Sequence, residues 1–249
     1  MSVAVAAMFA APGLAIGSFL NVVASRLPLR RSLVSPGSAC MSCGAEISRR
    51  DNVPVLSYLL LRGRCRSCGV HIPARYPAVE LVTGVLVAAC GLRFGLTPYA
   101  AIAAAFCIVL VAISAIDIEH RIVPNRIVLP AAAVALVVQL VREPSLEWPV
   151  AALGASLFLF VAALAYPRGM GMGDVKLALL LGAVLGWTVA AGMMIGLLAA
   201  LVPAVVLSAT RGAAARKVAI PFAPFLAFGA VVALFAGDRL IDWYLGLTG

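Results

Sequence analysis

Apolar runs alternate with short polar segments along the whole chain, and charged residues or Pro and Gly bound each run. Most runs approach the ~20 residues that an α-helix needs to cross a bilayer, although the second, fourth and sixth are shorter. Their approximate limits are Met1–Ser25, Ala78–Leu92, Pro98–Ile116, Ile127–Leu140, Trp148–Tyr166, Val175–Trp187, Ala190–Ala209 and Val218–Ala236. This pattern predicts an all-α polytopic membrane protein with about eight transmembrane helices.

The composition agrees with a membrane protein. Of the 249 residues, 63% are hydrophobic and only 12% are charged. Soluble globular domains have about 45–50% apolar and about 25% charged residues. These values exclude a disordered chain, a collagen and a small secreted disulfide scaffold. The first apolar run has no basic segment before it, so a cleaved signal peptide is not expected.

Basic residues are distributed unevenly between the two sides of the predicted membrane domain. If the N-terminus lies outside, 16 of the 19 Lys and Arg residues fall in four cytoplasmic segments. These segments are Arg26–Tyr76, Asp117–Arg126, Pro167–Lys176 and Arg211–Lys217. The positive-inside rule therefore favours this orientation. The net charge of +9 is then an orientation signal, and no nucleic-acid partner is expected.

Four of the six cysteines lie in the first cytoplasmic segment, as Cys40-Met-Ser-Cys43 and Cys65-Arg-Ser-Cys68. Two C-x-x-C pairs can supply four thiolates to a tetrahedral zinc ion, and the reducing cytoplasm disfavours disulfides. A loop of about fifty residues with few apolar positions cannot build a core alone, so a metal would stabilise it. We expect a small zinc-ribbon-like domain with structural zinc. Unliganded or redox-active cysteines are the alternative.

Two aspartates border apolar runs at the same predicted cytoplasmic depth. Asp117 follows an uncharged run, and Asp174 lies in Gly169-Met-Gly-Met-Gly-Asp174-Val-Lys176. Ionisable groups near the membrane core are costly and are therefore functional candidates. Two carboxyls suit acid–base hydrolysis of a peptide bond, because one can activate water while the other donates a proton. From the composition alone, helix capping or salt bridging explains both aspartates equally well.

A transporter or a zinc-dependent scaffold would also fit parts of this pattern. A transporter would show related halves and helices interrupted at mid-membrane, whereas the aspartates map to the cytoplasmic edge. A scaffold would need the cysteines but would have no use for paired aspartates.

Taken together, the motifs resemble those of the type IV prepilin peptidases, which are membrane aspartic proteases of the GxGD type. The resemblance runs from the first span to the last, and the motifs agree in order and spacing. The similar segments are Gly17-Ser-Phe-Leu-Asn-Val-Val-Ala-Ser-Arg-Leu-Pro28, Asp51-Asn-Val-Pro54, the two C-x-x-C pairs, Arg75-Tyr-Pro-Ala-Val-Glu80-Leu, Asp117-Ile-Glu-His-Arg-Ile-Val-Pro124, Gly171-Met-Gly-Asp174-Val-Lys-Leu177 and Pro221-Phe-Ala-Pro-Phe-Leu226. Ala223 stands where the family often has Gly, and Met41 stands where many members have Pro.

The resemblance implies cleavage of the short basic leader of prepilins or pseudopilins at the cytoplasmic face of the bacterial inner membrane. It implies that Asp117 and Asp174 are catalytic and that Gly171, Gly173 and Lys176 form the active-site loop. Members with the zinc-binding loop usually also N-methylate the new N-terminal residue with S-adenosylmethionine. The sequence assigns no residues to binding of this methyl donor.

The implied domains are a first transmembrane helix at 1–25, the four-cysteine domain at 26–76 and a membrane-embedded peptidase domain at 77–249. Within the last, the predicted helix ends favour unequal roles for the aspartates. Asp174 would begin a helix, where the dipole favours an anion, and Asp117 would end one, where the dipole favours the protonated acid. Glu46, Asp51 and Glu119 are the acidic residues expected nearest to the basic leader.

Overall fold

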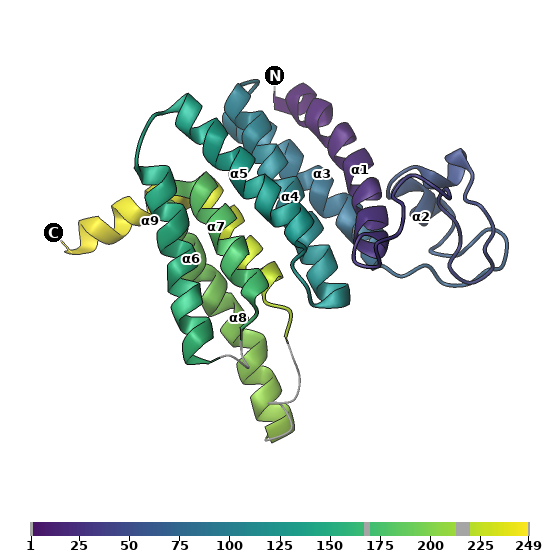
Figure 1. Ribbon diagram of the computed structural model, residues 1–249. Coiled ribbons are helices and arrows are strands. Elements are labelled where there is room, and N and C mark those ends of the chain that lie inside the picture. The colour runs from purple at the N-terminus through teal and green to yellow at the C-terminus, as the bar shows by residue number, and fades with distance from the viewer. Residues whose placement is uncertain (1, 167–169, 213–219, 249) are drawn as a thin grey trace. The chain divides into compact units, whose positions relative to one another are not determined.

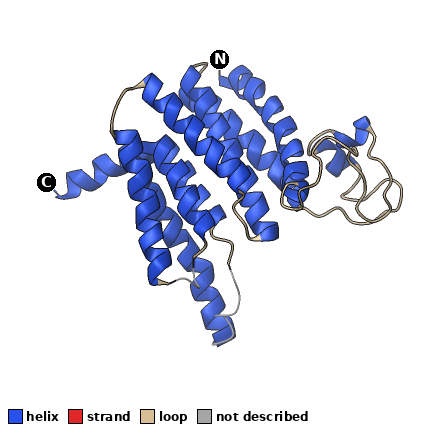
Figure 2. Cartoon of the chain, in the orientation of Figure 1, coloured by secondary structure: helices blue, strands red, loops and turns tan. Residues whose placement is uncertain are grey.

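The computed structural model describes residues 2–166, 170–212 and 220–248. Helices dominate this part of the chain (Figures 1 and 2). The only β-type pairings within the described residues are two isolated bridges in the loop after the first helix. The α-helices are α1 (Ser2–Arg26), α2 (Leu56–Leu60), α3 (Arg75–Phe94), α4 (Pro98–His120), α5 (Asn125–Arg142), α6 (Glu147–Ala165), α7 (Met172–Leu185), α8 (Val189–Arg211) and α9 (Ala223–Thr248). Two 3-10 turns, η1 (Arg49–Asn52) and η2 (Gly186–Thr188), complete the set. The predicted all-α fold is confirmed.

Seven segments of the described chain are long and apolar enough to cross a membrane, against about eight predicted. The difference lies in α7 and α8, which together form one candidate segment of 40 residues, Met172–Arg211. Gly186 interrupts this segment with a φ of +56°, a conformation that favours glycine. A side chain there would also overlap Glu147, whose Oε1 accepts a hydrogen bond from the Trp187 amide at 3.0 Å. The segment is therefore two helices joined by η2.

The chain divides into two compact units, residues 1–116 and 117–249. In the first unit, α1 and α3 pack closely because small residues face each other. A Cβ on Gly13 would lie 3.0 Å from the Gly84 Cα, and one on Gly17 would lie 2.7 Å from the Glu80 Cα. Leu20 of α1 packs with Val111 and Ala112 of α4, which gives the unit its apolar core.

The short helix α7 lies inside the second unit, against α5, α6 and α9. Ten of its 14 residues are buried. A Cβ on Gly182 would lie 2.5 Å from the Ala152 Cα, so only glycine lets α7 approach α6 this closely. Two side chains also bond to the α7 backbone: Gln139 Nε2 to the Val184 carbonyl at 2.9 Å and Ser156 Oγ to the Val175 carbonyl at 3.1 Å. Such satisfied backbone contacts fix the position of α7 between its neighbours.

Two predicted helix limits are wrong in instructive ways. α7 begins at Met172 rather than Val175, so Asp174 lies within its first turn. α9 continues to Thr248, past the predicted limit of Ala236, and it includes Asp238 and Asp242. Charge ends an apolar run, but it does not end a helix in which every residue can adopt helical dihedrals. Residues 218 and 219, at the predicted start of the last span, lie outside the described residues.

Candidate active site

Asp117 lies in the last turn of α4 and is only 6% exposed. Its Oδ2 accepts a hydrogen bond of 3.0 Å from the backbone N–H of Ala223, the first residue of α9. The carboxyl therefore caps the N-terminus of a helix that begins 106 residues further along the chain. Sequence reasoning identified the segment around Ala223 only as part of a late span and missed this contact.

Asp174 is the third residue of α7 and is 9% exposed. Its amide donates to the carbonyl of Gly171, the N-cap residue, at 3.1 Å, and its side chain hydrogen-bonds to the Gly171 backbone. The carboxyl at the third helical position thus supplies one half of a capping box, because the glycine N-cap has no side chain to supply the other half. The charge of Asp117 also acts on Asp174, so the two carboxyls lie within Coulombic range. The structure thus brings together two aspartates that are 57 residues apart in sequence.

Two contacts hold the segments that carry the aspartates against each other. A Cβ on Gly173 would lie 2.8 Å from the Val123 Cβ, which is closer than real side-chain contacts allow. Lys176 Nζ donates a hydrogen bond of 2.9 Å to Asn125 Oδ1, at the first residue of α5. Gly173 is therefore required for close approach, and Lys176 adds a polar link.

The hydrogen bond from the Ala223 amide to Asp117 changes the interpretation of the two aspartates. The sequence placed Asp117 only at a helix C-terminus, whereas its carboxyl also faces the N-terminus of α9. Asp117 thus lies at the C-terminal end of α4 and at the N-terminal end of α9, so two helix dipoles act on it in opposite directions, and the unequal roles of the two aspartates stay a prediction. Two buried carboxyls that share one site can still divide the tasks of acid and base, since like charges disfavour simultaneous ionisation.

Neighbouring ionisable residues lie in different surroundings. Glu119 is exposed and His120 is half-buried, with no hydrogen-bond partner for its buried Nε2 within the described chain. In the first unit, Glu80 Oε2 accepts a hydrogen bond of 2.7 Å from the Val55 amide. Glu80 therefore links the loop between α1 and α3 to helix α3.

The four loop cysteines form one cluster, with all four sulfur atoms within 4.8 Å of one another. Cys40 Sγ lies 3.8 Å from Cys68 Sγ. Zinc–sulfur bonds of ~2.3 Å in a tetrahedron place the sulfurs about 3.8 Å apart, so the spacing fits such an ion. The group could hold a metal, and its four soft donors match zinc.

Each C-x-x-C pair forms the same tight turn. The Cys40 carbonyl accepts a hydrogen bond from the Gly44 amide at 2.9 Å, and the Cys65 carbonyl accepts one from the Gly69 amide at the same distance. Both glycines have a positive φ near 70°. Hydrogen bonds from the backbone of Cys43 and Ser42 lower the pKa of Cys40 to about 6. These bonds thus favour the thiolate form of Cys40, whereas the pKa of Cys68 is raised to about 12.

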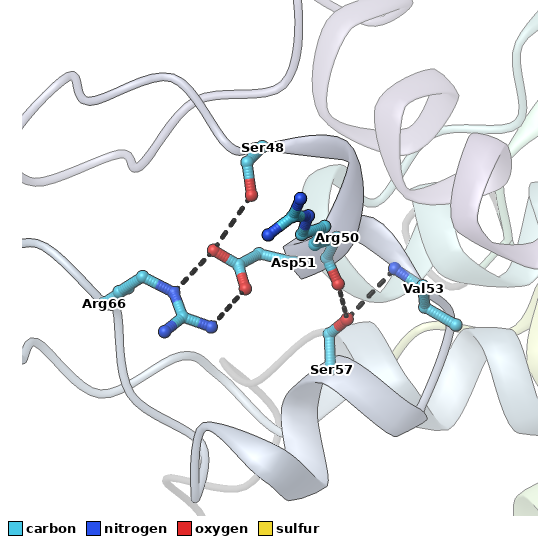
Figure 3. A network of polar contacts seen from close by, with 6 residues as sticks. All are labelled: Ser48, Arg50, Asp51, Val53, Ser57 and Arg66. Carbon is cyan, nitrogen blue, oxygen red and sulfur yellow. Dashed lines mark hydrogen bonds and ion pairs between the residues drawn. The ribbon is translucent and has the colours of Figure 1, made fainter.

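An ion pair between Arg66 and Asp51 holds the Cys65–Cys68 turn against the η1 segment. Arg66 donates from Nε and Nη2 to the two carboxylate oxygens of Asp51, at 2.8 and 2.6 Å (Figure 3). Ser48 Oγ adds a third hydrogen bond to Asp51 at 3.1 Å (Figure 3). The Arg66 hydrogen bonds lower the pKa of Asp51. Because these bonds occupy Asp51, the expectation that it contacts a basic leader loses its support.

Comparison with known proteins connects these sites to a family. The family model described as the type IV leader peptidase family matches residues 104–209, and that of the bacterial peptidase A24 N-terminal domain matches residues 12–94. A relative from Bacillus subtilis is 37% identical, over 95% of this chain and 96% of its own length. The chain belongs to the type IV leader peptidase family.

Other members of the leader peptidase family are similarly related. Proteins from Burkholderia pseudomallei and Pseudomonas aeruginosa are 39% and 34% identical over 95% of this chain, and over 86% and 92% of their own lengths. All three relatives carry the name prepilin leader peptidase/N-methyltransferase. No solved structure matches the chain. The family predicted from the motifs is confirmed.

The aspartate pair and the cysteine cluster lie in regions that are matched by two different family models. Asp117 and Asp174 lie within the region matched by the leader peptidase model, and the four cysteines lie within the N-terminal model. Ala223, whose amide binds Asp117, lies beyond both regions. Family membership and the seven apolar segments found among the described residues indicate a multi-pass protein of the bacterial inner membrane.

Proposed function

We propose that this chain is a membrane aspartic endopeptidase that removes the basic leader from type IV prepilins or pseudopilins. We further propose that it N-methylates the new N-terminal residue with S-adenosylmethionine. The observation that carries the first proposal is the pairing of Asp117 and Asp174, both buried and within Coulombic range. The printed names of the relatives support both activities.

In this mechanism, the two carboxyls act as base and acid. One carboxylate removes a proton from a water molecule, whose oxygen attacks the carbonyl carbon of the scissile peptide. The other, protonated carboxyl donates its proton to the leaving amine, so the peptide bond breaks. Oδ2 of Asp117 accepts the Ala223 amide, so a proton on Asp117 resides on Oδ1. Gly171, Gly173 and Lys176 would form the loop that positions Asp174.

The proposed orientation has the N-terminus outside and the active site facing the cytoplasm. The distribution of Lys and Arg residues supports it, although Arg168, Arg216 and Lys217 lie outside the described residues. In this orientation the basic leader would lie on the cytoplasmic side, where Glu46 and Glu119 are exposed. The remainder of the precursor would lie in the bilayer as a single apolar helix.

We assign the metal site a structural role. Cys40, Cys43, Cys65 and Cys68 would provide all four ligands of zinc, which leaves no open position for a catalytic water. Bound zinc would stabilise the loop, and the methyl group would come from the sulfonium of S-adenosylmethionine. The corresponding division is a first helix at 1–25, a metal-binding domain at 26–76 and the peptidase domain at 77–249.

The proposal is tested by incubating the purified chain in detergent with a prepilin-like peptide and measuring product masses. Removal of the leader is expected first, followed by addition of one methyl group when S-adenosylmethionine is present. Asp117→Asn and Asp174→Asn should abolish cleavage, whereas Asp238→Asn, on an exposed part of α9, should not. An intact peptide with the wild-type protein would favour the transporter or the scaffold instead.

A further inference from the structure

Lys176 lies two residues after Asp174 on the first turns of α7. Residues at this spacing do not share a helix face, so Lys176 points away from the side that carries the Asp174 carboxyl. Consistent with this, its Nζ bonds to Asn125 Oδ1 at 2.9 Å, and within the described residues no ion pair joins it to either aspartate. This geometry therefore does not favour a role for Lys176 in neutralising the charge of the aspartates.

The start of α7 is less buried than the rest of its first turn. Gly171 and Met172 are exposed and Gly173 is half-buried, whereas burial begins at Asp174. The residues that precede Asp174 therefore have few side-chain contacts to fix their position. The contacts of Gly173 with Val123 set its distance from the segment after α4, but glycine has no side chain that resists rotation.

We propose that Asn125 is a positioning residue, which acts through Lys176 to fix the rotation of the first turn of α7 and so directs Asp174 toward Asp117. Asn125 is suited to this role because it begins α5, a helix that packs against α7. A hydrogen bond from an ammonium to an amide oxygen is stronger than one between neutral groups. This inference rests on the proposed peptidase activity, and it goes further by assigning a residue outside the aspartate motifs.

The test compares Asn125→Leu, Lys176→Met, the double variant and Asn125→Asp in the peptide-cleavage assay. Loss of one charge-assisted hydrogen bond should lower kcat by about tenfold, with KM unchanged because the substrate contacts remain. The double variant should be no slower than the slower single variant, since both changes remove the same bond. Asn125→Asp keeps the acceptor oxygen and should restore kcat. Arg126→Leu, at the next exposed position of α5, is the matched control.

A second measurement does not depend on activity. Hydrogen exchange at the amides of residues 172–176 should be faster in Asn125→Leu and Lys176→Met than in the wild type, and unchanged in Arg126→Leu. A normal kcat in Asn125→Leu, losses that multiply in the double variant, or unchanged exchange would overturn the inference. If the wild type cleaves no peptide, the proposed function fails, and the exchange experiment still decides whether Asn125 fixes this turn.

Discussion

Replacing Gly173 by Ala should separate the two halves of the active site. The new Cβ would lie 2.8 Å from the Val123 Cβ and 3.2 Å from its Cγ2. Carbon atoms pack at about 3.5–4.0 Å, so the segments must move apart by about 1 Å. The Val123 Cβ is attached to the backbone and cannot rotate away. Overpacking of this kind costs about 1–3 kcal/mol, although Ala alone favours a helix by up to about 1 kcal/mol over Gly.

The effect on cleavage should exceed the effect on stability. A displacement of about 1 Å between reacting groups can lower the rate about 100-fold, so kcat/KM for the prepilin-like peptide should fall by about that factor. Adding Val123→Gly removes the closest atom and should restore activity, whereas Val123→Ala keeps that Cβ and should restore less. Gly154→Ala on α6 is the matched control, because a Cβ there meets nothing within 4 Å.

Peptide cleavage and the unfolding temperature in detergent, measured for each variant, decide this prediction. Wild-type activity in Gly173→Ala would refute the steric argument. The argument would also be refuted if the Gly173→Ala/Val123→Gly double variant remained folded but did not recover the lost activity.

Three further predictions concern the metal site and the Asp117 cap. Cys40→Ser should lower the zinc content measured by mass spectrometry, increase proteolysis of the loop and reduce methylation more than cleavage; full metal content in a variant lacking all four cysteines would refute the site. The lowered pKa of Asp51 means that its pairing with Arg66 stabilises the fold above the unfolded-state pKa and is lost as the pH falls through the folded-state pKa. Proteolysis of the loop should therefore rise less steeply on acidification in Asp51→Asn than in the wild type. Asp117→Asn keeps an oxygen that can accept the Ala223 amide and should retain the wild-type unfolding temperature, whereas Asp117→Leu removes the cap and should destabilise the protein by about 0.5–2 kcal/mol.

Hydropathy and spacing predicted the all-α fold, the four-cysteine cluster and the two aspartates. Each of these features is encoded locally: an apolar run gives a span, and a C-x-x-C-Gly turn places two sulfurs together. The prediction was weakest where one segment contacts another that is distant in sequence. No periodicity indicates that the Ala223 amide binds Asp117, or that Asn125 accepts a hydrogen bond from Lys176.

The break between α7 and α8 had a local signal, since Gly186 precedes Trp187 at the end of an apolar run. The apolar runs Val175–Trp187 and Ala190–Ala209 were accordingly predicted as separate helices, and the structure confirms two helices joined by η2. The start of α7, by contrast, was misplaced. Asp174 and Lys176 reduce the hydropathy of its first turn, but an acidic residue near a helix N-terminus is a stabilising feature.

The hydrogen bond between Ser156 and the Val175 carbonyl determines how deep Asp174 lies beside α6. The Trp187 amide bonds to Glu147 at the start of α6, so the two helices run in opposite directions, and Asp174 lies roughly level with Leu157. From there α6 continues for about eight residues to Ala165, or about 12 Å at ~1.5 Å per residue. Asp174 therefore lies about 12 Å short of the end of α6, alongside that helix and not at its tip. A substrate segment that starts level with Ala165 would need about four extended residues, at ~3.3 Å each, to reach the carboxyl.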